Sequence, residues 1–336
     1  MMNKIKIAVD AMGGDNSPKK VIDGIFHNLK ENDDTFYNIF GDQDIINDFM
    51  PKSFNKDFIK ITNTKKKILD TDSPLSAAKK GKETSMWLAI ESLKNKEADV
   101  AISAGNTGAL FVLAKLNLKM IENIDKPALS ALWPNKNGFN VVLDLGANIE
   151  CNEKNLLDFS IMGASIFKAL YPNDKPKVAL LNIGSEELKG NEIIKKAFQI
   201  LNERNNDFKF SGYIEGNNIM DGNVNVIVTD GFTGNIALKT AEGTANFIMN
   251  EFKNTMTSNI LGKISSLINI SNLRKTKKKL DPRLYNGAIL TGLDSPVVKS
   301  HGSTDFIGFS NSLNVCRRIV KGDLIKKIKL NIKDEN

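Results

Sequence analysis

The chain has 336 residues, and its 46 lysine and arginine residues against 39 aspartate and glutamate residues give a formal net charge of +7. Hydrophobic residues make up 41% and charged residues 25%, a balance typical of a soluble globular protein that excludes a disordered chain or a disulfide-rich miniprotein. The positive charge is compatible with three kinds of partner: nucleic acid, an anionic membrane, or acidic substrates and proteins.

Several functional classes are excluded by motifs that the sequence lacks. No run approaches 18 uninterrupted apolar residues, so we expect no membrane-spanning helix, and the N-terminus has no apolar region typical of a signal peptide. Cys151 and Cys316 fit no zinc or redox spacing, which favours a reducing, cytoplasmic compartment. With only His27 and His301, a histidine-rich metal site is excluded and no metal is expected. Neither a P-loop nor a nucleophile-elbow motif occurs.

One pattern recurs along the chain: a short β-branched run, a turn rich in Gly, Asn, Ser or Asp, and a helix-like stretch. Strands that alternate with helices predict βαβ units, and near-continuous apolar strands indicate a mostly parallel sheet with helices on both faces. Because the chain contains no clear linker, we expect a single α/β domain over residues 1–336. The predicted strands are Ile5–Val9, Val100–Ser103, Val141–Leu145, Val178–Ile183 and Val224–Thr229.

The turns after these strands are candidates for an anion-binding site. Ligands of open parallel sheets bind at the carboxyl ends of the strands, where glycine-rich turns offer backbone N–H groups and helix N-termini. For any single turn, the need for a positive φ angle is the simpler explanation. Five such turns in one sheet favour a phosphate-type site, and we expect them to converge on one edge of the sheet.

Two loops carry most of the predicted phosphate contacts. Ser103–Gly108 can cradle an anion through its amides, with Ser103 and Thr107 as hydroxyl donors. Asp10–Asn16 is a second loop of the same kind. His301 lies in a loop of Gly, Ser, Thr and Asp, where a contact with an anion is reasonable, although a lone histidine is more often structural.

Two further side chains could stabilise a developing negative charge. Lys189 follows a predicted strand and can offer a point charge to phosphate or to an oxyanion, whereas a solvated loop lysine is the alternative. Asn235 could donate to an oxyanion or cap a helix, and capping is the commoner role. Neither cysteine lies in a context that favours a nucleophile.

The segment from Phe252 to Leu280 differs from the rest of the chain, because apolar residues recur at helical spacing with basic residues between and after them. Such a basic amphipathic excursion can pack on the domain, join a dimer, or lie on an anionic membrane. Composition alone favours packing. The apolar positions are Phe252, Met256, Ile260, Leu261, Ile264, Leu267, Ile268 and Leu273, and the basic positions are Lys253, Lys263, Arg274, Lys275, Lys277, Lys278 and Lys279.

Eight short motifs, in one order from residue 5 to about residue 313, closely resemble the bacterial phosphate acyltransferase family PlsX. Each motif is weak alone, and the set is highly specific. The motifs are Val9–Asp15 with Ser17 and Pro18, Ser103–Ala109, Leu143–Asn148, Leu181–Gly184 with Lys189 and Gly190, Tyr213–Gly216, Asp230–Asn235, Tyr285–Ala288 and Lys299–Gly302.

The resemblance implies a Rossmann-type three-layer α/β/α fold, similar to that of phosphotransacetylases and isocitrate-type dehydrogenases. It implies that orthophosphate attacks the thioester of a long-chain acyl carrier protein, which gives acyl phosphate for a glycerol-3-phosphate acyltransferase of phospholipid synthesis. It further implies a homodimer that associates peripherally with the cytoplasmic membrane, and neither a cofactor, a metal nor a covalent acyl-enzyme.

This chemistry fits the residues. Phosphate is already anionic near neutral pH, so positioning and oxyanion stabilisation should dominate over base catalysis. We therefore expect Lys189 and Asn235 to stabilise the oxyanion. The membrane or carrier contact is expected at Leu261, Ile264, Leu267 and Ile268. The expected phosphate and substrate contacts are Asp10, Gly13, Gly14, Asp15, Ser103, Gly105, Asn106, Thr107 and His301.

Four alternatives remain open from the sequence. A short-chain phosphotransacetylase would use coenzyme A thioesters instead of acyl carrier protein. An NAD-dependent fold relative is disfavoured because no GxGxxG motif follows a strand. A non-catalytic membrane scaffold would have no use for converging anion-binding loops. A nucleic-acid binder is disfavoured, and no nucleic acid is expected as partner, because aromatic residues are not interleaved with basic ones.

Overall fold

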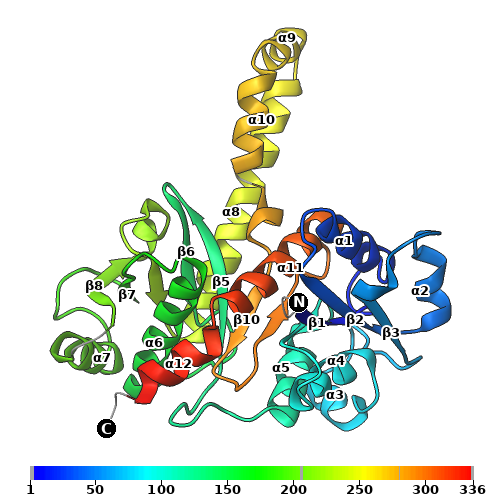
Figure 1. Cartoon of the computed structure of the whole chain (residues 1–336). Coiled ribbons are helices and arrows are strands. Elements are labelled where there is room, and N and C mark those ends of the chain that lie inside the picture. The colour runs from blue at the N-terminus through cyan, green and yellow to red at the C-terminus, as the bar shows by residue number, and fades with distance from the viewer. Residues whose placement is uncertain (1–3, 205–206, 280, 334–336) are drawn as a thin grey trace.

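The computed structural model describes residues 4–204, 207–279 and 281–333, and of residues 266, 276–279 and 333 it describes the backbone alone. This part of the chain forms an eleven-stranded sheet in the order β3-β2-β1-β4-β11-β10-β5-β6-β9-β7-β8 (Figure 1). The strands are β1 (Ile5–Asp10), β2 (Thr35–Gly41), β3 (Ile59–Asn63), β4 (Val100–Ser103), β5 (Ala128–Asn135), β6 (Gly138–Leu143), β7 (Lys177–Asn182), β8 (Lys209–Glu215), β9 (Val226–Val228), β10 (Ala288–Thr291) and β11 (Val297–Lys299).

Helices flank the sheet on both sides. The α-helices are α1 (Lys19–Leu29), α2 (Gln43–Phe49), α3 (Pro74–Lys80), α4 (Ser85–Lys94), α5 (Thr107–Asn117), α6 (Glu153–Leu170), α7 (Glu192–Glu203), α8 (Gly231–Thr257), α9 (Ile260–Ile268), α10 (Ile270–Lys279), α11 (Phe306–Lys321) and α12 (Leu324–Lys333). Short 3₁₀ turns occur at Lys56–Phe58, Gly216–Asp221 and Pro282–Tyr285.

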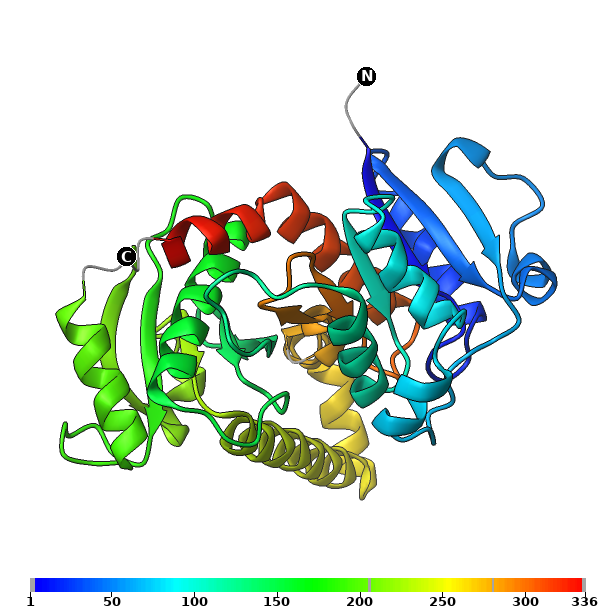
Figure 2. The same ribbon diagram turned by 90° about the horizontal axis from the view of Figure 1, so that it is seen from below.

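The two faces of the sheet support separate hydrophobic clusters. Alternate side chains of β1 point to opposite faces, so Ile7 and Val9 pack with α1, α6, α11 and α12, whereas Ala8 packs with α4 and α5. In the other half of the sheet, Val142 packs towards the first turns of α8. Figure 2 shows α11 and α12 (orange to red) along one side of the molecule and α8 (olive) along the other. The predicted fold class, a mostly parallel α/β sheet with helices on both faces, is confirmed.

The sheet consists of two parallel blocks joined by antiparallel strands. In one block, β11, β4, β1, β2 and β3 run in the same direction, and in the other, β6, β9, β7 and β8 do so. The pairings β11–β10, β10–β5 and β5–β6 between them are antiparallel. Because three reversals separate β11 from β6, the carboxyl ends of the two blocks face opposite edges. The expectation that all the glycine-rich turns converge on one edge is therefore wrong.

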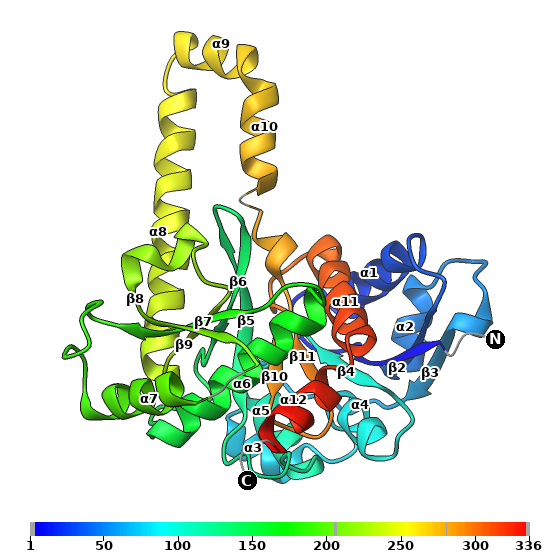
Figure 3. The ribbon, with the colours of Figure 1, turned by 60° about the vertical axis from the view of Figure 1, so that its left-hand side comes forward.

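A helical arm, α8–α10 with residues 231–279, projects from the body (Figures 1 and 3). The predicted amphipathic segment forms the outer part of this arm, while α8 extends back to Gly231 at the sheet. Residue 280, the end of that predicted segment, lies outside the described residues. Within α8, the buried positions are Gly231 and Gly234. No helix in the described part of the chain combines the length and hydrophobicity needed to cross a membrane.

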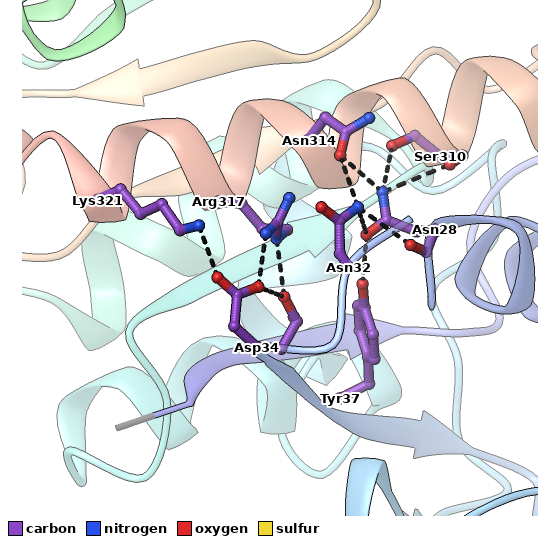
Figure 4. Close-up of polar contacts among 9 residues, drawn as sticks. Asn28, Asn32, Asp34, Tyr37, Ser310, Asn314, Arg317 and Lys321 are labelled. Atoms are coloured by element: carbon purple, nitrogen blue, oxygen red, sulfur yellow. Dashed lines mark hydrogen bonds and ion pairs between the residues drawn. The ribbon is translucent and has the colours of Figure 1, made fainter. Parts of the chain in front are cut away.

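Helix α11, near the end of the chain, binds to α1 and to Asp34 near its beginning (Figure 4). The amide nitrogen of Asn28 on α1 donates to Asn314 Oδ1 at 2.9 Å, and the Tyr37 hydroxyl donates to Asn28 Oδ1 at 2.8 Å. Arg317 and Lys321 both pair with Asp34. These buried and half-buried contacts hold α11 against the N-terminal block.

Candidate active site

Three loops meet at the carboxyl ends of β1, β4 and β11, and we call residues 10–16, 103–107 and 300–305 the glycine-loop cluster. The backbone N–H of Asp15 donates to the carbonyl oxygen of Gly302 at 3.0 Å, which joins the first loop to the third. The Ser103 hydroxyl donates to Asp10 Oδ2 at 2.6 Å, which joins the second loop to the first. The adjacency of β11 to β4 brings the third loop, from the far end of the chain, into this group.

Glycine is required where these loops touch. Gly14 has a φ angle of +80°, and a Cβ there would lie 2.7 Å from the carbonyl oxygen of Ala104. A Cβ on Gly13 would lie 2.6 Å from the backbone nitrogen of Gly105. Only a residue without a side chain allows this approach. The backbone N–H groups of Gly13, Gly14 and Gly302 have no acceptor within the described part of the chain, so the cluster offers several unpaired donors.

Asp10 and Ser103 lie beneath the loops and are committed to holding them together. Asp10 is buried, its Oδ1 accepts the N–H of Met12 at 3.1 Å, and its Oδ2 accepts the Ser103 hydroxyl. Burial raises the pKa of Asp10, and the hydrogen bond from Ser103 partly offsets that rise. Ser103 Oγ in turn accepts the N–H of Gly105 at 3.0 Å. The geometry therefore gives these two residues a positioning role.

Two lysines beside the cluster, Lys20 and Lys299, are not among the predicted site residues. Lys20 Nζ donates to the carbonyl oxygen of Gly302, and Lys299 Nζ donates to the carbonyl oxygens of Ala104, at 3.3 Å, and Ser300. Burial lowers the pKa of both, and the nearby charge of Lys20 helps to lower the pKa of Lys299 to about 8. The available signal for Lys20 was its place at the start of the helix after a glycine loop, where phosphate-binding lysines stand in other proteins.

The remaining predicted residues of the cluster differ in whether their polar groups are exposed or already hydrogen-bonded. Asn106 caps α5, since its Oδ1 accepts the N–H of Ala109 at 2.9 Å, and its amide nitrogen donates to the carbonyl oxygen of Asp70 at 2.9 Å. Thr107 lies exposed in the first turn of α5. His301 is also exposed, and its Nδ1 lies 3.1 Å from Ser303 Oγ. Desolvation and the charge of Lys299 lower the pKa of His301.

A second group of loops follows β6, β9 and β7, and the first turns of α8, which carry Asn235, pack against the loop after β6. Gly231 and Gly234 bring the start of α8 onto the loop after β6, where added Cβ atoms would lie 2.4 Å from Asn148 O and 2.0 Å from Asp144 O. Asn235 follows directly, is exposed, and donates from Nδ2 to the carbonyl oxygen of Leu145 at 3.2 Å. The helix cap is Asp230, so capping does not explain Asn235.

Lys189 lies in the loop after β7. Its backbone N–H donates to Glu186 O at 2.9 Å, and its carbonyl oxygen accepts from Asn182 Nδ2 at 3.1 Å. Gly190 has a φ angle of +93° and approaches Asn182 too closely for a Cβ. The loop is therefore held by its backbone, while the exposed ammonium group of Lys189 has no partner within the described residues.

Helix α8 runs from this second group towards the glycine-loop cluster. The charges of Lys239 and Glu242 on α8 act on the pKa of His301, so these residues lie near the loop after β11. From Asn235 to Glu242 the helix rises about 10 Å. Although the two groups of strand ends face opposite edges, α8 thus spans the distance between Asn235 and the glycine-loop cluster.

The fold and this geometry define an α/β protein in which glycine-rich loops gather at the carboxyl ends of parallel strands. Within the described ranges, no cluster of three or more His, Cys, Asp and Glu side chains offers a metal site. A family model described as "Fatty acid synthesis protein" matches residues 5–327.

Curated relatives agree over the full length. A phosphate acyltransferase of Pelagibacter ubique is 70% identical and covers 99% of this chain and 100% of its own. Another phosphate acyltransferase, from Caulobacter vibrioides, is 42% identical over 99% of this chain and 93% of its own. The chain therefore belongs to the phosphate acyltransferase family, as the sequence motifs predict.

Solved structures support the fold. A phosphotransacetylase from Streptococcus pyogenes aligns with a TM-score of 0.63 at 17% identity, over 97% of this chain and 95% of its own. A branched-chain phosphotransacylase from Enterococcus faecalis aligns with a TM-score of 0.57 at 14% identity, over 94% and 99% of the two chains. At these identities the likeness concerns the fold alone.

Proposed function

We propose that the protein transfers a long-chain acyl group from the thioester of acyl carrier protein to orthophosphate. A phosphate oxygen attacks the thioester carbonyl carbon, and the tetrahedral intermediate collapses with cleavage of the carbon–sulfur bond. The products are acyl phosphate and the carrier thiolate, which takes up a proton. The observation that carries the proposal is that Gly13, Gly14 and Gly302, whose N–H groups have no acceptor among the described residues, lie beside the ammonium groups of Lys20 and Lys299.

In this proposal, phosphate occupies the glycine-loop cluster. The unpaired amides donate to its oxygens and the two lysines balance its charge. Asp10 and Ser103 position the loops from beneath, and Asp15, Gly105, Asn106, Thr107 and His301 surround the site. Because the nucleophile is already an anion, its placement against the carbonyl carbon contributes more than a general base would.

Lys189 and Asn235 are proposed to stabilise the oxyanion. Lys189 lies on the loop after β7 and Asn235 in the first turns of α8, and tight glycine contacts fix the backbone that carries each donor before the reaction. Preorganised donors of this kind are the largest single contribution in many acyl transfers. A thiol leaving group needs little protonation, which fits a site with few histidines.

The test is a comparison of acyl donors. With phosphate present, we expect thiol release and acyl phosphate from palmitoyl-acyl carrier protein, and at least 100-fold less from acetyl-coenzyme A at equal concentration. Equal or greater activity with acetyl-coenzyme A would identify a short-chain phosphotransacetylase and overturn the donor assignment. Thiol release that does not depend on phosphate would overturn the proposed nucleophile.

We further propose a homodimer with peripheral membrane contact in the cytoplasm, where a glycerol-3-phosphate acyltransferase consumes the acyl phosphate. The helical arm supports this proposal, since α8 buries little of its surface within one chain and α9 exposes apolar side chains. Leu261 and Ile268 are 78% and 77% exposed, and Ile264 and Leu267 accompany them. Basic residues around them complement anionic lipid.

A further inference from the structure

A cavity of about 280 Å³ opens among the loops that follow β6, β7 and β9, close in sequence to Lys189 and Asn235. It lies at the carboxyl ends of β7 and β9 and extends to the starts of α6 and α7. Asp230 at its wall caps α8, the helix that carries Asn235. Asn191 at its wall caps α7 and lies two residues after Lys189. The residues that line it are Ile149, Glu150, Cys151, Leu156, Leu180, Leu181, Asn191, Ile193, Ile194, Val228, Thr229 and Asp230.

The floor of this cavity is apolar. Leu156, Leu180 and Val228 are buried core residues. Cys151 stands beside them, and burial raises the pKa of its thiol to about 11, so it is a neutral, weakly polar group at physiological pH. Polar atoms at the wall belong to Glu150, Asn191, Thr229 and Asp230, and the two carboxylates repel a phosphate group.

The rim of the cavity is also apolar, although it faces solvent. Ile149 at the mouth is 77% exposed, and on the neighbouring loop Ile183 and Leu188 are 81% and 88% exposed. Packing within the chain does not account for large aliphatic side chains so fully in water beside Lys189. A ligand with a long apolar part would cover them on its way from the reacting carbonyl to the cavity.

We infer that this cavity binds the distal part of the substrate's acyl chain and thereby sets the preferred chain length. The inference rests on the proposed acyl transfer. An apolar cavity of about 150 Å³ holds one benzene molecule, so this one accommodates on the order of ten carbon atoms. Each methylene that leaves water for the cavity raises kcat/KM about fourfold. The amide-rich arm of a carrier or coenzyme would leave its polar groups unpaired on this floor.

The first test narrows the cavity. Cys151→Phe fills it from a half-buried position, and Cys151→Ser removes the thiol without adding volume. We expect Cys151→Phe to lower kcat/KM at least tenfold for palmitoyl-acyl carrier protein while activity with the octanoyl donor stays within twofold. Cys151→Ser should keep the wild-type ratio of kcat/KM values with the palmitoyl and octanoyl donors. An equal loss at all chain lengths, or no change at any length, would overturn the inference.

The second test needs no turnover. Cys316 is fully buried, so methyl methanethiosulfonate should label Cys151 first, as mass spectrometry can show. We expect decylphosphonate, a soluble alkyl chain with an anionic head, to slow this labelling at least tenfold, and methylphosphonate to leave it unchanged. A labelling rate that decylphosphonate does not change would exclude the cavity as the binding site of the acyl chain. If wild-type protein makes no acyl phosphate yet shows this protection, the proposed reaction fails and the alkyl site stands.

Discussion

Arg317 on α11 and Asp34 before β2 form an ion pair with an Nη2–Oδ1 distance of 2.5 Å, although 283 residues separate them in the sequence. Lys321, one turn further along α11, binds the other carboxylate oxygen at 2.6 Å. Burial alone would raise the pKa of Asp34, but the hydrogen bonds from Lys321 and Arg317 outweigh it and lower the pKa to about 2. The contact joins the end of the chain to the parallel block whose strands β1, β4 and β11 lead into the glycine-loop cluster.

Asp34→Asn should lower the free energy of unfolding by about 1–2 kcal/mol at pH 7, after allowance for solvent screening. Because the folded-state pKa lies below the unfolded value, the stabilisation is complete above about pH 4 and is lost as pH falls towards 2. Urea denaturation from pH 7 to pH 3 should show the difference shrinking below pH 4. Asp33→Asn, an exposed neighbour, is the control. A difference independent of pH would contradict the ion-pair explanation.

Lys189→Ala and Asn235→Ala should each lower kcat about 100- to 1000-fold, the usual effect of removing one oxyanion donor. Their melting temperatures should stay near that of the wild type, because both side chains are exposed. Acyl phosphate formation under saturating substrate measures the effect. Lys196→Ala, which removes an exposed charge on α7, should keep full activity. Near-normal turnover in either variant would remove that residue from the proposed mechanism.

The KM for phosphate should rise roughly tenfold between pH 7 and pH 9. Lys299 has a pKa of about 8, so its ammonium group is charged below this pH. Above this pH the charged fraction falls about tenfold for each pH unit. Lys299→Met should have a high KM at pH 7 and no step near pH 8. Lys19→Met, an exposed lysine on α1, should retain the step. A wild-type KM that does not change over this range would argue against phosphate binding by Lys299.

Gly234→Ala should destabilise the protein by about 1–3 kcal/mol and reduce activity, because its Cβ would lie 2.0 Å from Asp144 O and displace the start of α8. The matched control is Gly243→Ala on the same helix, where a Cβ meets nothing within 4 Å. That variant should be neutral or more stable by up to about 1 kcal/mol. Thermal unfolding and acyl phosphate formation check both. Equal stability of the two variants would show that α8 does not depend on this contact.

The double variant Leu261→Glu and Ile264→Glu should lose flotation with anionic liposomes, because charged side chains at the tip of the arm cannot enter the headgroup region. Wild-type protein should float with phosphatidylglycerol vesicles. Leu75→Glu changes an exposed leucine of α3, away from the arm, and should float like the wild type. If the double variant floats unchanged, the tip of the arm is not the anchor.

Local sequence patterns predict five of the strands in the two parallel blocks and miss β2, β3, β8 and β11. Each of the five predicted strands is present, with ends shifted by a few residues, as at β6 and β9. The antiparallel centre was not predictable in this way, because the partners of β10 and β5 are chosen by contacts between residues far apart in sequence. The three reversals between β11 and β6 separate the turns into two groups, which no local pattern reveals.

The same limit explains the missed lysines. Lys299 belongs to a recognised motif, yet its ammonium group reaches Ala104 O only because β11 lies beside β4. Lys20 is held in its buried position by a hydrogen bond to the carbonyl oxygen of Gly302, which comes from the opposite end of the chain. In contrast, residue type alone is enough to predict the loops that contain Gly13, Gly14 and Ser103. The membership of the family, predicted from the whole set of motifs, is confirmed.

The position of β10 and β11 in the middle of the sheet has a consequence for biosynthesis. While the ribosome makes the chain, β4 pairs with β1 on one side, but its other edge stays open until residues 297–299 emerge. The two blocks are therefore joined late, after the helical arm has been made. A chain that stops within the arm would present an unpaired apolar edge, which favours aggregation. The last strands to be synthesised, β10 and β11, are thus the ones that join the two blocks of the sheet.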